Sequence, residues 1–142
     1  MSFANPEPEE IRALLKGVKT IAVVGFSPRP GRPSNNISRS LQRYGLRIIP
    51  VRPGIGEGLG EKAYPDLGAV PPSLGIDLVN VFRAGDKVLP VVEECLALGL
   101  KAIWLQDGVV NEQAALRARA GGMRVVMDRC LLRDYTRLCV ER

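Results

Sequence analysis

Short apolar runs alternate with amphipathic segments along this chain. The apolar runs predict β-strands at residues 20–25, 47–51, 77–82, 102–106 and 124–127. Apolar residues at helical spacing predict helices at residues 9–17, 34–45, 86–98, 111–120 and 131–138. Residues 52–74 are rich in Gly and Pro, which predicts a loop with one helical turn, long enough to fold over a ligand.

The alternation of strands and helices indicates βαβ units. We therefore expect residues 1–142 to form a single α/β domain, with a doubly wound, five-stranded parallel sheet and helices on both faces. Right-handed crossovers favour the strand order 3-2-1-4-5, counted along the chain, with a topological switch point between strands one and four. Ligands of such sheets bind at the carboxyl ends of the strands. The residues at these ends are then expected to form one crevice: 25–27, 51–53, 81–83 and 106–108.

The first strand runs directly into a basic, Gly/Pro-rich turn at a predicted helix start. A helix N-terminus offers unpaired N–H groups and a positive dipole end, which together favour a phosphate. Gly25 lets the backbone approach a ligand that a Cβ would exclude. Arg29 and Arg32 add positive charge, and Ser27 can donate its hydroxyl, so the turn predicts a nucleotide-phosphate site.

The turn lacks the G-x-G-x-x-G fingerprint of dinucleotide-binding proteins. Ser27 and Pro30 stand at two of the three glycine positions, and Arg52 replaces the acidic residue that would hold an adenosine ribose. An arginine there favours an extra ribose phosphate, as in coenzyme A (CoA) or NADP, over NAD. The alternative is that Arg52 is simply a solvated loop residue.

Composition narrows the classes of partner. The net charge of +5 comes mostly from 15 arginines, but the basic residues are scattered and aromatics make up only 5%, so nucleic-acid binding gains little support. Apolar runs are too short for a membrane helix and the first residues lack a signal pattern, so we expect a cytoplasmic protein with no membrane partner. The three cysteines are far apart and predict neither a disulfide framework nor a metal site.

Catalytic chemistry finds few candidates. The chain has no histidine, which removes the commonest general base and any Ser-His or Cys-His pair, so binding is favoured over catalysis and no catalytic residue is assigned. Cys130 precedes the last helix and could form a mixed disulfide with a CoA thiol, although an inert, buried cysteine is the commoner case. Asn111 and Glu112 are expected to cap a helix, and Trp104 to pack in the core. Phe82 could cover an adenine or pack in the core.

Six ordered strings, VVGFSPRPGRPS, IIPVRP, GEKAYPDL, VNVFR, WLQDGVVNE and VVMDRC, resemble the small CoA-binding proteins related to the N-terminal domain of the succinyl-CoA synthetase α subunit. The resemblance covers nearly the whole chain and implies a Rossmann-like fold that holds CoA or acyl-CoA at the strand ends. It places the nucleotide phosphates near the turn after strand one, the adenosine beside residues 51–53, and residues 81–83 on the facing wall. It also implies that Gln106 and Val109 lie near the centre of the crevice or near the pantetheine arm.

The expected cofactor-binding residues are Gly25, Phe26, Ser27, Arg29, Arg32, Ser34, Val51, Arg52, Pro53, Val81, Phe82, Arg83, Gln106 and Val109. The synthetase's ligase domain is missing and a phosphohistidine relay cannot run without histidine, so a non-catalytic CoA-binding module, with a protein partner left open, is the first interpretation. The alternative is an NADP-dependent oxidoreductase or another nucleotide-using enzyme.

Overall fold

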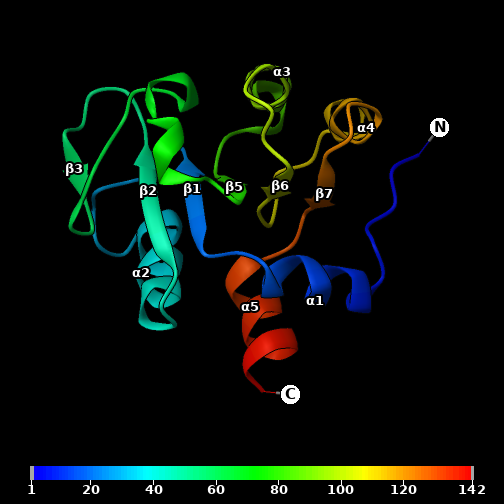
Figure 1. The fold of residues 1–142 in the computed structure, drawn as a ribbon, viewed down its shortest axis with the longest axis horizontal. Coiled ribbons are helices and arrows are strands. Elements are labelled where there is room, and N and C mark those ends of the chain that lie inside the picture. Colours follow the sequence, from blue (N-terminus) through cyan, green and yellow to red (C-terminus); the bar gives the residue numbers. More distant parts are fainter. Residues whose placement is uncertain (1, 142) are drawn as a thin grey trace.

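The computed structural model describes residues 2–141 and has three layers (Figure 1). A five-stranded parallel sheet forms the middle layer, in the spatial order β2 (Arg47–Val51), β1 (Thr20–Val24), β5 (Leu78–Val81), β6 (Ala102–Leu105) and β7 (Arg124–Met127). Helices α3 (Val88–Ala97) and α4 (Glu112–Ala120) cover one face. Helices α1 (Pro8–Lys16), α2 (Pro33–Arg43) and α5 (Leu131–Tyr135) cover the other, and a π-helical turn at Thr136–Val140 continues α5.

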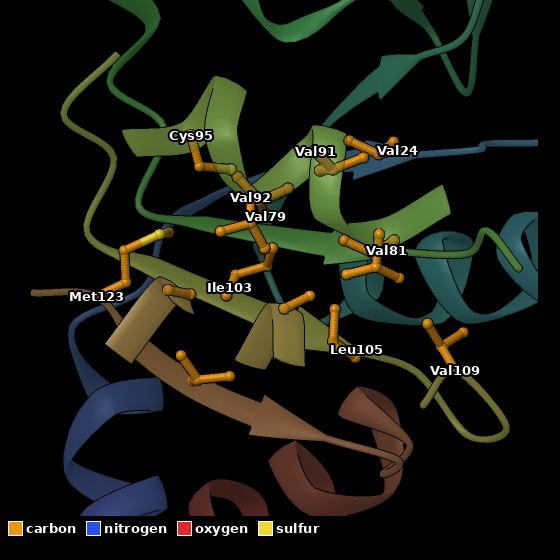
Figure 2. Packing of buried hydrophobic residues seen from close by; sticks show 14 of the residues in the cluster. Val24, Val79, Val81, Val91, Val92, Cys95, Ile103, Leu105, Val109 and Met123 are labelled. Carbon is orange, nitrogen blue, oxygen red and sulfur yellow. The ribbon is translucent and has the colours of Figure 1, made fainter. Parts of the chain in front are cut away.

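The predicted α/β class, the parallel sheet and the helices on both faces are confirmed. Strands β1, β5 and β6 are buried along their whole length, which is why they read as continuous apolar runs. Figure 2 shows Val92 of α3 beside Val79 of β5, and Val91 of α3 beside Val24 of β1, in the core on the α3 face. Trp104 is fully buried on the opposite face, and its Nε1 donates to the carbonyl of Arg129 at 2.8 Å, as expected for a packing residue.

The predicted strand order is wrong. Counted along the chain, the five strands follow the order 2-1-3-4-5, so the switch point lies between β1 and β5. The crossover rule fixes the hand of each connection but not the face on which it runs. Helix α2 joins β1 to β2 on one face, whereas the connection from β2 to β5 buries Leu67 and Val70 on the other. A right-handed crossover on that opposite face turns the chain back past β1.

The stretch between β2 and β5 is held in place along its course. It contains the two-stranded hairpin β3 (Glu57–Gly58) and β4 (Glu61–Lys62) and 3₁₀ turns at Leu67–Ala69 and Pro72–Leu74. Arg47 of β2 donates to both carboxylate oxygens of Glu61, at 2.9 and 3.0 Å, and Gln42 of α2 donates to the carbonyl of Leu59 at 3.0 Å. The expected loop is therefore an anchored hairpin beside α2.

Candidate functional site

Gly25 closes the end of β1 against both neighbouring strands. Its N–H donates to the carbonyl of Val51 at 3.0 Å, and the N–H of Phe82 donates to the carbonyl of Val24 at 2.8 Å. Gly25 has a φ of +84°, and a Cβ on it would lie 2.5 Å from the carbonyl oxygen of Phe82. The contact that requires glycine here is thus with β5, and the absence of a Cβ brings the strand ends together.

The turn after Gly25 is shaped by side chains from the first turn of α2. The N–H of Ser27 donates to Oγ of Ser34 at 2.8 Å, and Nδ2 of Asn35 donates to the carbonyl of Ser27 at 3.1 Å. Oγ of Ser27 accepts from the N–H of Arg29 at 3.2 Å. Both serines are buried, so their first role is to fix the turn.

The start of α2 keeps unused donors. Within residues 2–141, the backbone N–H groups of Ser34 and Asn35 have no acceptor, and no side chain caps this helix. Arg29 and Arg32 flank this helix start and are exposed. The predicted helix start is therefore present, with two N–H groups free to donate to a ligand and two exposed arginines just before it; that it binds a phosphate stays a prediction.

A hollow of about 400 Å³ lies at the carboxyl ends of β2, β1 and β5; we call it the basic hollow. Its lining comprises Gly25, Arg52, Pro53, Phe82, Arg83, Ala84 and Lys87. Three of these residues are basic, and none of the lining residues within the described chain is acidic. Nη1 of Arg52 donates to the carbonyl of Phe26 at 3.4 Å, so its guanidinium is held beside the turn. A hollow with this charge suits a phosphorylated ligand.

A second hollow of about 480 Å³, the β6 hollow, adjoins the first. It is lined by Pro33, Ile37, Phe82, Arg83, Gln106, Asp107, Gly108 and Val109. Phe82 and Arg83 line both hollows and form the boundary between them. Together the two hollows offer a basic half and a less charged half, which is the layout that a nucleotide joined to a longer uncharged arm needs.

Residues 128–133, which follow β7, hold the loop after β6 through hydrogen bonds. Oε1 of buried Gln106 accepts from the N–H of Leu131 at 2.9 Å and thereby positions the start of α5. Oδ1 of Asp128 accepts from the N–H of Gly108 at 2.7 Å. Asp107 at the rim pairs with Arg133 at 3.3 Å, and this hydrogen bond is the main cause of the raised pKa of Arg133.

The structure brings seven of the fourteen predicted residues to the two hollows. These are Gly25, Arg52, Pro53, Phe82, Arg83, Gln106 and Val109. Val51 and Val81 are packed in the core, and Phe26 is fully buried under Gly58 of the hairpin. The side chains of these three residues thus serve packing, and the prediction that these positions contact a cofactor stays a prediction that only their backbone could fulfil.

Sequence reasoning missed Lys87 and Ile37. Lys87 ends the 3₁₀ turn Gly85–Lys87, which precedes α3, and this turn brings it back to the basic hollow. Its signal was a basic residue six positions after the last residue of β5 and one before the helix. Ile37 lies one turn into α2 and lines the β6 hollow, although its helical spacing marks it equally as a core residue.

Size alone does not select this site. A larger hollow of about 600 Å³ lies between α1 and the start of β7, with Glu10, Arg119 and Arg124 in its walls. It is away from the carboxyl ends of the strands and mixes both signs of charge. Residues 2–141 contain no group of three or more His, Cys, Asp or Glu side chains placed to hold a metal ion. In the same part of the chain, no helix is both long and apolar enough to cross a membrane.

The fold is that of a Rossmann-like α/β protein, with a basic crevice at the carboxyl ends of its parallel strands. The model of the CoA binding domain family matches residues 19–136, and the chain belongs to this family. The family expected from the six strings is confirmed.

Three comparisons extend this result. The chain is 42% identical to the uncharacterized protein YneT of Bacillus subtilis over 127 residues, which cover 89% of this chain and 93% of that protein. The crystal structure of Prb, a redesigned PH1109 protein, has a TM-score of 0.91 and 33% identity, covering 99% and 97% of the two chains. A dinucleotide-forming acetyl-coenzyme A synthetase of Ca. Korarchaeum cryptofilum has a TM-score of 0.67 and 30% identity over 78% of this chain but only 26% of its own.

Proposed function

We propose that this chain binds CoA, or an acyl-CoA, at the carboxyl ends of β1, β5 and β6 and acts as a non-catalytic binding module. The observation that carries the proposal is the basic hollow, with Arg52, Arg83 and Lys87 around it, joined to the β6 hollow across Phe82. The basic hollow suits the phosphorylated adenosine half of CoA. The β6 hollow, with Ile37 and Phe82 in its lining, suits the uncharged pantetheine arm.

The residues present fit this ligand. Ser34 and Asn35 offer N–H groups that no group within residues 2–141 accepts. CoA carries a diphosphate and a ribose phosphate, and the three cations of the basic hollow are opposite in sign to this charge. Bound CoA would present its thiol, or an acyl thioester, at the far end of the pantetheine arm.

The comparisons support binding more strongly than any reaction. The family is described by CoA binding, and the Korarchaeum synthetase carries a related region in about a quarter of its length. This chain has no histidine, so we limit the proposal to binding. Three thiols without disulfide partners and a small intracellular ligand fit a cytoplasmic protein.

Thermal-shift and calorimetric titration of ligand-stripped protein with CoA, dephospho-CoA, NADP and NAD test the proposal. We expect CoA to bind and dephospho-CoA, which lacks the ribose phosphate, to bind less tightly. Arg83→Gln and Lys87→Gln should each weaken CoA about tenfold or more, because a hydrogen bond to a charged group contributes about 1.5–3 kcal/mol.

Lys101→Gln is the matched control for Lys87→Gln, since exposed Lys101 precedes β6 at the opposite end of the sheet. It makes the same change in net charge and should leave CoA affinity unchanged. Equal weakening by Lys101→Gln would show that only overall charge matters. Binding of NADP without CoA would refute the proposed ligand.

A further inference from the structure

The two loops that wall the crevice touch each other beyond the hollows. The loop after β5 carries Phe82, Arg83 and Lys87, and the loop after β6 carries the residues from Gln106 to Val110. A Cβ on Gly85 would overlap the carbonyl group of Val110. The first loop therefore packs backbone to backbone against the second, and only glycine permits this approach.

Asn111 fastens this contact with its side-chain amide. Nδ2 of Asn111 donates to the carbonyl of Gly85 at 3.0 Å, while its Oδ1 accepts from the N–H of Ala114 at 2.9 Å as the N-cap of α4. Its backbone N–H points to Sδ of Met127 at 3.4 Å. One residue thus joins the loop after β5, the first turn of α4 and the end of β7.

The two hydrogen bonds of the Asn111 side chain make different demands. Capping α4 needs only an acceptor, which Ser, Thr or Asp would also supply. The bond to Gly85 needs a donor on a side chain long enough to reach the neighbouring loop, and an aspartate has none. The choice of asparagine is therefore explained by the loop contact and not by the cap alone.

We propose that Asn111 is a positioning residue for the crevice: it holds the loop with Arg83 and Lys87 at a fixed place relative to the β6 hollow. This inference rests on the proposed CoA function. The cations of the basic hollow then meet the ligand from a preorganised loop, and part of the ordering cost of binding is avoided. Loss of the Asn111 amide donor should make the loop after β5 more mobile, whereas a replacement that keeps an acceptor at position 111 preserves the cap of α4.

The test compares Asn111→Ser with wild type. Serine keeps the cap and adds no charge but is too short to span to Gly85. We expect amide hydrogen exchange in residues 83–88 to become faster while residues 112–120 keep their protection. CoA affinity should fall about threefold to tenfold, as for one neutral hydrogen bond, and more for CoA than for dephospho-CoA.

Asp66→Ser is the control at a second cap, because Oδ1 of Asp66 accepts from the N–H of Ala69 at 2.9 Å, away from the crevice. It should leave exchange at residues 83–88 and CoA affinity as in wild type. If Asn111→Ser leaves exchange at residues 83–88 unchanged, the positioning role is refuted whether or not CoA binds. If exchange rises but wild type fails to bind CoA, the proposed function fails and the loop-holding role of Asn111 stands.

Discussion

Replacing Gly25 by alanine should damage the site and the fold through one contact. The residue has a φ of +84°, which costs a side chain about 1–2 kcal/mol. The new Cβ would also lie 2.5 Å from the carbonyl oxygen and 3.0 Å from the carbonyl carbon of Phe82, both backbone atoms. The backbone of Phe82 cannot move freely, because its N–H donates a hydrogen bond to the carbonyl of Val24 at 2.8 Å. Overpacking of this kind costs about a further 1–3 kcal/mol.

Gly54→Ala is the matched control. Gly54 has the same φ of +84°, and a Cβ there meets nothing within 4 Å. The Gly54→Ala variant should therefore lose only the part of the free energy of unfolding that comes from the positive φ, about 1–2 kcal/mol. Urea denaturation gives both free energies of unfolding, and an unchanged slope with denaturant shows that the unfolded state is comparable. Equal losses for the two variants would refute the argument that close approach of β1 to β5 requires glycine at position 25.

Two further predictions concern buried groups. The side chain of Asn80 is fully buried in β5, and its Oδ1 and Nδ2 have no hydrogen-bond partner within residues 2–141. Asn80→Val should therefore raise the free energy of unfolding, measured by urea denaturation, by about 1–3 kcal/mol. A lower free energy of unfolding in the variant would instead reveal a buried water that satisfies the amide. Burial raises the pKa of the Cys95 thiol from 9.0 to about 12. Because the folded state favours the neutral thiol, this group stabilises the fold fully below pH 9, and that stabilisation is lost as the pH rises toward 12. Urea denaturation between pH 8 and about 11.5 should show a shallower loss in Cys95→Ala than in wild type, and identical profiles would contradict this.

The elements of the fold were predictable because each is encoded locally. The bounds of β2 and β7 agree with the sequence prediction at both ends, and the N-cap of α4 at Asn111 is confirmed by its bond to Ala114. A buried strand or a capped helix depends on residues within its own segment. Pro50 in β2 is a further local signal that the prediction did not use. Proline has no N–H and is therefore tolerated mainly in edge strands, which favours the observed order, in which β2 lies at the edge of the sheet.

The candidate site was only partly predictable, because lining residues depend on contacts between distant segments. Phe26 follows Gly25 directly, yet it is fully buried because Gly58 of the distant hairpin packs against its ring. Lys87 was missed because a 3₁₀ turn, and not a regular helix, precedes α3. The second bond of Asn111, to Gly85, joins residues 26 positions apart and leaves no local pattern.

The strand order has a direct consequence for ligand choice. In the predicted order, β1 would lie between β2 and β6, and Arg83 would stand beyond β2, two strands from Gly25. In the observed order β1 lies between β2 and β5, so Arg52 and Arg83 approach Gly25 from its two sides. Only this arrangement puts the guanidinium groups of both loops around one hollow. The expected preference for a ligand with several phosphates therefore follows from the face on which the β2–β5 connection runs as much as from the basic residues themselves.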